Sequence, residues 1–560
     1  MTRIFIAGGL DLLGQAPFPA PLPHVVWSRH GAEMVCGEDS RQSWRAEPME
    51  LVWILGDQLL PEHPLLPAPE DGRWVAMVES VPRASRLRYH QQKLTLLFAA
   101  MRHHGAALKQ AGHRVLYHRL EDPLPGSSGS PPADPPDSGA VLAAWIALHG
   151  VRAIHLLEPN DFHTQAALPA LAERLGVPIH THPSPQFLLP RADFLAWAKG
   201  RRTLVMEQHY RRLRKQLGVL MEADGQPVGG VWNTDADNRQ TRAQFRKARP
   251  LVPSLPPPPQ DPVVRLFADH PGRASDLWLP TTRAGALAWL ERFVAERLAG
   301  FGPWEDLMVE AEPVLFHSVL SPLLNIGLLT PMECVRAAEA AYAEGRAPLA
   351  SVEGFVRQIV GWREFIHGMY WRHMPEYGQV NALEAHRPLP SWAYTGETEL
   401  RCVATAIQDA LRLGYNHHIQ RLMVLGNYFL LGAYEPQVVL RWYLEMYVDA
   451  YDWVMVPNVL GMVLYADGGW FATKPYTAGP PYLDKMGDHC AQCRYNPKLK
   501  TGPDACPFQA LYWAIQIRHA ERFRGHPRMA MMVRQVDRME EGLRQVYTEE
   551  AERFLEGQGV

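Results

Sequence analysis

The hydrophobic pattern of this chain changes once, and that change limits what the chain can fold into. Residues 51–200 alternate short apolar runs with stretches in which apolar residues recur at helical spacing. From about residue 281 to 555 the pattern is nearly all helical and dense in aromatic residues. Alternating strands and helices are typical of a doubly wound parallel sheet. The sequence therefore predicts an α/β N-terminal domain with a doubly wound parallel sheet, followed by a large all-α C-terminal domain.

Four apolar runs in the first part are predicted to be buried strands. They are LVWILGDQL (51–59), RWVAMVES (73–80), HRVLYHRL (113–120) and AIHLLEP (153–159). Residues 91–112 are predicted to form a helix that stops at a glycine. Ligands of such sheets bind beyond the carboxyl ends of the strands, where Asp57 and Gln58 follow the first strand. A polar pair in a loop is more often only a turn, so both interpretations stay open from the pattern alone.

Composition along the chain suggests a division into four parts. They are a poorly structured extension (1–48), an α/β domain (49–200), an interdomain connector (201–280) and a helical domain (281–560). The extension is rich in Pro and Gly without periodicity, and Met49 stands directly before the first convincing strand. We therefore expect residues 1–48 to be dispensable. The proline-rich stretch 249–262 within the connector is predicted to be extended.

Charge and hydropathy constrain the partners only weakly. The formal net charge is −3, so any DNA contact must come from a local basic surface such as residues 211–216 or 239–249. No apolar run reaches the roughly 20 residues that cross a bilayer. The first residues lack the basic flank, apolar stretch and cleavage site of a secretory signal. We expect a cytoplasmic protein without a membrane partner.

Three of the six cysteines lie close together near the C-terminus. Cys490 and Cys493 are separated by two residues, and Cys506 follows after 12 intervening residues. The short pair lets two thiolates bind one metal centre, and a third thiolate from the same loop needs a fourth partner. Spacing alone leaves zinc, with His489 as the nearest fourth ligand, and an iron–sulfur cluster evenly matched. A haem attachment is excluded because Arg494, not His, follows Cys493.

Five further strings resemble those of one protein family. They are LFHSVLSPLLNIGLL (315–329), SVEGFVRQIVGWREFIHGMYW (351–371), NHHIQRLMVLGNYFLL (416–431), RWYLEMYVDAYDWVMVPNVLGM (441–462) and ADGGWFATKPY (466–476). The first resembles the flavin-phosphate loop of photolyases, the second their central helix, and the next two the helices that enclose the flavin ring. With the cysteine loop, the pattern resembles the iron–sulfur bacterial branch of the photolyase–cryptochrome family. The resemblance runs from about Leu51 to the last helices and implies the photolyase fold with FAD bound in the helical domain.

The resemblance implies a set of FAD-binding residues: Ser318, Leu320, Ser321, Asn325, Arg363, Arg421, Asp449 and Met455. The serines would serve the pyrophosphate, although a serine pair before a helix is often only a cap. Arg421 and Asp449 would pair beside the flavin ring, with a structural salt bridge as the alternative. Met455 stands where the branch usually has Glu facing flavin N5. Because Met cannot exchange a proton, altered redox behaviour is expected. Trp362 would line the substrate cavity.

Two further groups are implied by the same resemblance. The branch has a fourth cluster ligand far upstream, and Cys402 precedes Cys490 by a similar separation, 88 residues. The resemblance therefore implies a 4Fe–4S cluster held by Cys402, Cys490, Cys493 and Cys506. It also implies a 6,7-dimethyl-8-ribityllumazine antenna in the N-terminal domain. The candidate antenna contacts at the strand ends are Asp57, Gln58 and Glu79.

The tandem His417–His418 resembles that of (6-4) photolyases, in which a histidine near the lesion takes part in proton transfer. Adjacent residues on a helix point about 100° apart, so one ring can face the cavity while the other packs. We expect His418 to be the proton donor and His417 a supporting contact. Eukaryotic enzymes carry a second histidine where this chain has Leu422, so their two-histidine mechanism does not transfer.

Trp442 and Tyr443 resemble residues that relay electrons to the flavin, whereas aromatic residues at helical spacing are more often core. A third relay position, usually Trp, is Tyr394, which is harder to oxidise. The function implied is repair of (6-4) photoproducts in UV-damaged DNA by a monomer that uses reduced FAD. The alternative is a blue-light photoreceptor, a cryptochrome that signals through a partner. A zinc-dependent DNA-binding module would leave the flavin motifs unexplained.

Overall fold

The computed structural model describes residues 49–66, 68–69, 72–127, 135–255 and 267–558. The predicted extension 1–48 lies outside the described residues, as does part of the proline-rich stretch 249–262. The N-terminal part contains one five-stranded, wholly parallel sheet with the order β3-β2-β1-β4-β5. Its strands are β1 (Met49–Trp53), β2 (Trp74–Val78), β3 (Arg114–His118), β4 (Val151–Leu157) and β5 (Ile179–His182). The four predicted strands are confirmed, and β5 is an additional edge strand.

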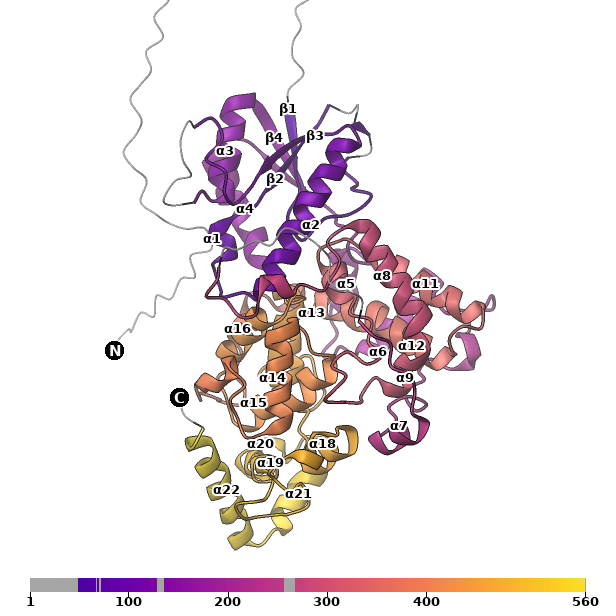
Figure 1. The fold of residues 1–560 in the computed structure, drawn as a ribbon, viewed down its shortest axis with the longest axis vertical. Helices are drawn as coiled ribbons and strands as arrows, with labels where there is room; N and C mark the ends of the chain where they lie inside the picture. Colours follow the sequence, from indigo (N-terminus) through magenta and orange to yellow (C-terminus); the bar gives the residue numbers. More distant parts are fainter. Residues whose placement is uncertain (1–48, 67, 70–71, 128–134, 256–266, 559–560) are drawn as a thin grey trace, which may run out of the picture.

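The two faces of this sheet bury alternate residues against different helices. Leu51 and Trp53 of β1 pack in one core with Val141, Leu142 and Leu168. Val52 of β1 packs in a second core that extends into the helical half. Successive side chains of a β-strand point to opposite faces of the sheet, so neighbouring residues of β1 enter different cores. Figure 1 shows α3 and α4 on one side of the sheet and α2 on the other.

The helices of the α/β part and of the connector are short except for α2. They are α1 (Val81–Ala84), α2 (Gln91–Gln110), α3 (Ser138–His149), α4 (Phe162–Leu175), α5 (Arg191–Ala198), α6 (Met206–Leu217), η2 (Val228–Gly230), α7 (Arg242–Ala248) and η3 (Ala274–Asp276). The predicted helix over 91–112 is confirmed as α2, which ends just before Gly112. Strand order runs outward from β1 in both directions, so the loop after β1 lies at the switch point where such sheets bind ligands.

From residue 281 onward the described chain forms helices and loops and no strand, as predicted. The helices are α8 (Arg283–Glu296), α9 (Leu298–Trp304), α10 (Ser321–Asn325), α11 (Pro331–Ala343), α12 (Leu349–Val356), η4 (Arg357–Arg363), α13 (Glu364–His373), η5 (Glu376–Gln379), η6 (Ser391–Tyr394), α14 (Arg401–Leu413), η7 (Gln420–Gly426), α15 (Asn427–Leu431), α16 (Pro436–Met446), α17 (Asp452–Met455), η8 (Val456–Val463), α18 (Pro480–Met486), η9 (His489–Gln492), α19 (Pro507–Arg518), α20 (Ala520–Phe523), α21 (Ala530–Arg538) and α22 (Glu541–Glu556). Within the described chain, no helix combines the length and apolar character that a membrane span requires.

Three helices widen into π-helical turns at η4, η7 and η8. The first two lie inside the strings 351–371 and 416–431, and the third overlaps the string 441–462 and ends one residue beyond it. A π-helical turn is rare and occurs most often at functional sites, because it displaces side chains from ordinary helical positions. The backbone therefore departs from regular geometry in the same three strings.

Side chains at the N-terminus of α2, beginning with His90, form hydrogen bonds between the α/β part and the helical part. The His90 Nδ1 accepts the Gln92 N–H at 3.2 Å, so its Nε2 carries the proton and donates to the Leu411 carbonyl at 3.0 Å. The Gln92 amide donates to the next carbonyl, that of Arg412, at 2.7 Å. Burial lowers the pKa of His90 to about 4, which keeps the ring neutral.

Candidate functional site

The loop before α10 is strained at two residues that are not glycine. Leu315 has φ 48° and Val319 has φ 51°. A β-branched residue such as valine is seldom found in this left-handed region, and such strain gathers at ligand-binding loops. The Ser318 carbonyl accepts the Trp289 indole N–H at 3.0 Å, and Leu320 is buried just before α10. The strained segment thus coincides with the string that resembles the flavin-phosphate loop.

Asp449 is the centre of the polar network in the helical half. Its carboxylate accepts two bonds from the Arg421 guanidinium, at 2.9 and 3.2 Å, and one from the Ser321 hydroxyl at 2.7 Å. Its carbonyl accepts the Asn325 amide at 2.9 Å. Arg421 also lies over the Tyr447 ring, 4.0 Å from its centroid. Four of the residues predicted to bind the cofactor therefore belong to one hydrogen-bond network. They are Ser321, Asn325, Arg421 and Asp449.

Arg363 supplies buried donors that the described protein leaves without acceptors. One nitrogen, Nη1, bonds Glu364 at 3.2 Å, whereas Nε and Nη2 have no partner in the described chain. The guanidinium stacks 4.2 Å above Phe187 and 5.2 Å from the Trp453 ring. An unpaired buried donor is costly, so these two N–H groups fit an acceptor on a bound molecule. Burial raises the pKa of Glu364 to about 7, although Arg363 opposes that shift.

His417 is buried and His418 is exposed, as expected for adjacent residues that point in different directions. His417 is buried and stacks on His317, with ring centroids 4.5 Å apart and an interplanar angle of 6°. Neither nitrogen of His417 has a partner among the described residues. Burial, followed by the nearby His317, holds the pKa of His417 well below its usual range. His417 is therefore a neutral packing ring.

His418 is exposed to solvent, yet protein surrounds it closely. Desolvation by that protein, with smaller contributions from the charges of Arg421 and Arg239, lowers the pKa of its imidazole to about 4. The His418 side chain therefore combines solvent exposure with a desolvating protein environment. Trp362, the predicted cavity residue, is half-buried and packs with Phe471 at a centroid distance of 5.9 Å.

Two of the predicted relay residues are in ring contact, and the third, Tyr394, follows a residue that bonds one of them. Trp442 and Tyr443 are buried with ring centroids 5.2 Å apart, and the Tyr443 hydroxyl donates to the Arg421 carbonyl at 2.7 Å. The Trp442 indole N–H donates to the carbonyl of Ala393, the residue before half-buried Tyr394. Tyr394 in turn donates to Glu445 at 2.7 Å. Met455 is buried at the end of α17.

Cys402 lies near the other three predicted cluster cysteines although it is distant from them in sequence. Burial raises the pKa of the Cys402 thiol well above its usual range, and Cys506, Cys490 and Cys493 are all near enough to raise it further. Burial likewise raises the pKa of Cys506 to about 12, with Cys490 and Cys493 adding to the shift. Cys402 lies in the first turn of α14, whereas Cys506 caps α19. No described cysteine forms a disulfide.

The cysteine group is looser than a single-ion site. Among the described residues, no three His, Cys, Asp or Glu side chains converge closely enough to hold one metal ion. A tetrahedral zinc ion at about 2.3 Å from each thiolate would need sulfur atoms only about 3.8 Å apart. Cys334, by contrast, is a lone buried thiol in the core, as the sequence predicted.

The predicted antenna residues divide into two kinds. Asp57 accepts the Asn160 amide at 3.0 Å, and burial raises the pKa of its carboxyl, opposed by Arg83. Gln58 is buried and donates to the Glu158 carbonyl at 2.8 Å, which leaves its own carbonyl oxygen unpaired within the described chain. Arg83 is exposed, binds Asp161 at 2.9 Å, and is still strongly desolvated. The switch point therefore combines the half-buried Asp57 and the buried Gln58 with an exposed guanidinium at Arg83.

Glu79, the third predicted antenna residue, has a separate set of hydrogen-bond partners. Its carboxylate accepts two bonds from Arg102, at 2.7 and 2.8 Å, one from the Tyr117 hydroxyl and one from the Leu120 N–H. Four internal donors give this buried charge a structural role. An antenna contact at Glu79 stays a prediction, and it would have to replace one of these bonds.

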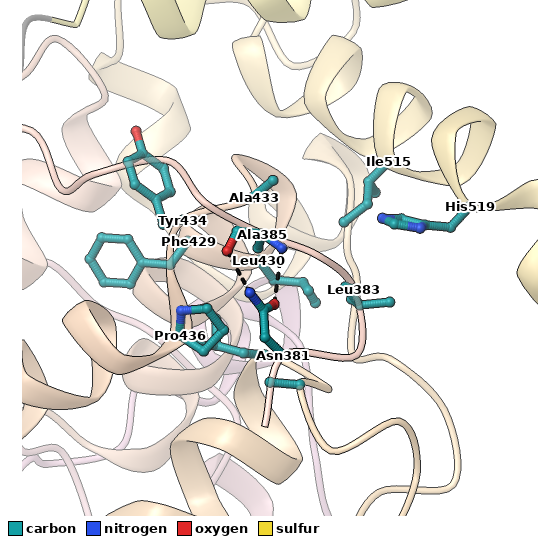
Figure 2. Close-up of a pocket in the computed structure, with 12 residues that line it drawn as sticks. Asn381, Leu383, Ala385, Phe429, Leu430, Ala433, Tyr434, Pro436, Ile515 and His519 are labelled. Atoms are coloured by element: carbon teal, nitrogen blue, oxygen red, sulfur yellow. Dashed lines mark hydrogen bonds between the residues drawn. The ribbon is translucent and has the colours of Figure 1, made fainter. Parts of the chain in front are cut away.

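A small apolar cavity lies between α15 and α19, beside the Asn381 side chain (Figure 2). Asn381 exchanges two hydrogen bonds with Ala385, drawn as dashed lines. The cavity measures about 10 Å³. A cavity needs about that volume to hold one water molecule, so this one is a packing defect and no ligand site.

Several side chains at these sites were missed by sequence reasoning. They are Phe187, His317, Trp453, Arg83 and Asp161. His317 and Trp453 could have been singled out, because each stands within one of the strings that resemble the family, 315–329 and 441–462. The others contact their partners only through the tertiary fold.

Comparison with known proteins agrees with this architecture. The model of the deoxyribodipyrimidine photo-lyase-related protein family matches residues 52–278. Two solved structures have similar folds. A bacterial class III photolyase from Agrobacterium tumefaciens has a TM-score of 0.54 and 17% identity, covering 93% of this chain and 100% of that one. A cryptochrome from Synechocystis sp. PCC6803 has a TM-score of 0.51 and 14% identity, covering 78% and 86%. The predicted photolyase/cryptochrome fold is confirmed.

Sequence similarity defines the family. A protein of Agrobacterium fabrum (strain C58 / ATCC 33970) is 40% identical over 512 residues, covering 90% of this chain and 99% of that protein. The chain therefore belongs to the photolyase–cryptochrome family. That relative is named a (6-4) photolyase.

Proposed function

We propose that this chain is a DNA-repair lyase that uses light to reverse (6-4) photoproducts in UV-damaged DNA. The observation that carries the proposal is 40% identity to a (6-4) photolyase across 99% of that protein's length. The position of His418 adds to it, because this histidine combines solvent access with protein on several sides. A lesion flipped out of the duplex needs a site that is open to solvent and lined by protein.

FAD is the cofactor that the helical half fits. The unpaired N–H groups of Arg363, the strained loop at Val319 and the Asp449 network are the supporting observations. The residues that would hold FAD are Ser318, Leu320, Ser321, Asn325, Arg363, Arg421, Asp449 and Met455. When bound in its reduced form, FAD supplies the light-driven electron. Arg421 keeps its charge through Asp449 and would orient the ring, while the apolar surroundings of Met455 exclude water.

His418 would move the proton in this reaction. Returning the transferred hydroxyl or amine group of a (6-4) lesion requires a proton beside the lesion, and imidazole is suited to provide it. In the free protein, desolvation holds its pKa near 4, so the ring is neutral. DNA phosphates brought to the site would raise that pKa, because negative charge favours the protonated imidazole. His417, buried against His317, would set the position of the His418 backbone.

The predicted relay residues would restore the reduced cofactor. Tyr394 is half-buried, whereas Trp442 and Tyr443 are buried, so the relay would lead inward from the surface to Arg421. Tyrosine at 394 is harder to oxidise than the tryptophan usual in this branch, so we infer slower photoreduction.

We infer a 4Fe–4S cluster at Cys402, Cys490, Cys493 and Cys506. The support for this assignment is the cysteine spacing, which resembles that of the iron–sulfur branch, and the nearness of Cys506, Cys490 and Cys493 to Cys402. The chemistry such a cluster supplies is electron transfer, and its thiolates would join α14 to the loop before α19. Asp57 and Gln58 would contact the lumazine antenna; the buried Gln58 carbonyl oxygen, which has no partner in the described chain, supports that assignment.

The second candidate function is a blue-light photoreceptor, favoured by the similarity of the fold to a cryptochrome. The two functions differ in whether illumination changes the lesion. The reduced protein should be illuminated with oligonucleotides that carry either a (6-4) photoproduct or a cyclobutane dimer, with dark samples as controls. The proposal expects restoration of the (6-4) substrate only, and only in light. Binding without restoration would favour the photoreceptor. A monomeric state and a cytoplasmic location stay predictions.

A further inference from the structure

A second cavity, about 700 Å³ in volume, lies between α7, α18 and the loop that carries the cysteines. We call it the basic recess, defined by Arg242, Lys485, Lys498 and Lys500, with Asp484 as its only acidic side chain among the described residues. Figure 1 shows α7 and α18 as neighbours in the lower part of the helical half, above α21 and α22. The recess differs from the sites above, since none of its lining residues belongs to them.

The positive charge of the basic recess is largely uncompensated. Arg242 pairs with Asp484 at 3.2 Å. None of the three lysine ammonium groups has an ion pair or a hydrogen bond in the part of the chain that the structure describes. Three clustered ammonium groups repel one another, and a polyanion would relieve that repulsion. The chemistry of the recess therefore fits phosphate groups.

The loop that presents two of these lysines is held by its own backbone. The Asn496 N–H donates to the Asp504 carbonyl at 2.7 Å, and the Cys506 N–H donates to the Asn496 carbonyl at 3.2 Å. The Asn496 side chain accepts the Lys498 N–H at 2.9 Å. Pro497 and the exposed Leu499 add an apolar part to the wall. An ordered loop loses little conformational entropy when it binds.

Arg239 lies near both the basic recess and His418. It stands three residues before Arg242, and its charge contributes, after desolvation and Arg421, to the lowered pKa of the His418 imidazole. Its guanidinium pairs with Asp235 at 3.0 Å and with Glu305 at 3.4 Å. The lysines of the basic recess have no such partners in the described chain, so they are the cations available to phosphate. Charge complementarity and the proposed repair of DNA favour a nucleic-acid backbone over an acidic protein as the occupant.

We propose that the basic recess binds backbone phosphates of the duplex that flanks the lesion. The inference rests on the proposed function for the identity of the DNA, but binding can be measured without repair. Lys485, Lys498 and Lys500 would neutralise about three phosphates, which corresponds to a slope of about 2.7 in log affinity against log salt. The contribution to affinity at 0.1 M salt is on the order of a hundredfold.

The test compares the flavin- and iron-loaded protein with the triple variant Lys485→Gln, Lys498→Gln and Lys500→Gln. A control of equal charge change is Lys109→Gln, Arg119→Gln and Arg152→Gln, all exposed on the α/β part. Affinity for a lesion-containing duplex is measured by fluorescence anisotropy at several salt concentrations. The recess variant should bind on the order of a hundredfold more weakly, with a salt slope smaller by about 2.7. The control should match wild type, and all three should keep the same flavin and iron content.

Two outcomes would overturn the proposal. One is an unchanged affinity and salt slope in the recess variant. The other is unchanged DNA binding together with lost binding of a polyglutamate probe, which would assign the recess to an acidic protein. If the recess variant loses affinity but wild type never repairs the lesion in light, the recess proposal stands and the proposed function fails.

Discussion

Arg421 and Asp449 form a two-bond ion pair, at 2.9 and 3.2 Å, whose carboxylate also accepts the Ser321 hydroxyl, while the Asp449 backbone carbonyl accepts the Asn325 amide. Asp449→Asn would leave the largely buried guanidinium without its charge partner. Removing one member of a buried pair typically costs about 3–5 kcal/mol. We expect a loss of unfolding free energy of that order and a large loss of FAD content, measured by denaturant titration and flavin absorbance. Ser321→Ala, which removes one bond, should cost about 1 kcal/mol. Full FAD content in Asp449→Asn would argue against a cofactor role for the pair.

The cysteine group gives a prediction about metal content. Cys490→Ser or Cys506→Ser should lose iron and most soluble protein, because the cluster joins distant segments. Wild type prepared without oxygen should contain four iron atoms per chain if the cluster is 4Fe–4S. Cys334→Ser, in a buried thiol away from the group, is the matched control and should retain iron. Stoichiometric zinc without iron in wild type would show that the cluster assignment is wrong.

Met455 gives a prediction about photoreduction. Met455→Glu introduces an exchangeable proton where the thioether has none. The rate of flavin photoreduction and the accompanying absorption changes should differ from wild type, with little change in FAD content. Met455→Leu, which adds no proton donor, should behave as wild type does. Identical rates and spectra in wild type and Met455→Glu would show that this position does not control the redox chemistry.

Buried neutral histidines make stability depend on pH. The folded pKa of His90 is about 4, below the unfolded value of about 6.5, so the unfolded state takes up the proton first. The contribution of His90 is therefore complete above pH 6.5 and is lost as the pH falls toward 4, by up to about 1.4 kcal/mol per pH unit. His90→Asn keeps a cap acceptor but does not titrate. Denaturant unfolding at pH 7.5 and 5 should show a smaller pH dependence in this variant; equal dependence would contradict the assignment.

Much of the fold was predictable because buried strands and helices leave strong apolar patterns. The runs at 51–59 and 153–159 are covered on both faces of the sheet, so their apolar residues are nearly continuous. β5 was missed because it is an edge strand, where His180 and Thr181 are exposed and the pattern is polar.

The candidate site was predictable only in part. Spacing drew attention to Cys490, Cys493 and Cys506, but only the fold brings α14 and Cys402 to them. Glu79 was placed correctly at the end of β2, yet its partners Arg102 and Tyr117 come from other elements and could not be seen in sequence. The stack of His317 on His417 likewise joins residues 100 positions apart. Local patterns predict elements, whereas the partners of a polar side chain depend on the tertiary fold.

Whether His418 serves a light-driven repair reaction is tested most directly by single-turnover repair of a (6-4) lesion. Wild type and His418→Ala, both with fully reduced FAD and saturated with lesion DNA, are illuminated with the same blue-light dose, and restored thymines are counted. Wild type should restore the lesion in proportion to the dose. His418→Ala should restore none, while its FAD content and DNA affinity stay at the wild-type level. Repair by His418→Ala at the wild-type rate, or lesion binding by illuminated wild type without any restoration, would contradict the proposed function of this site.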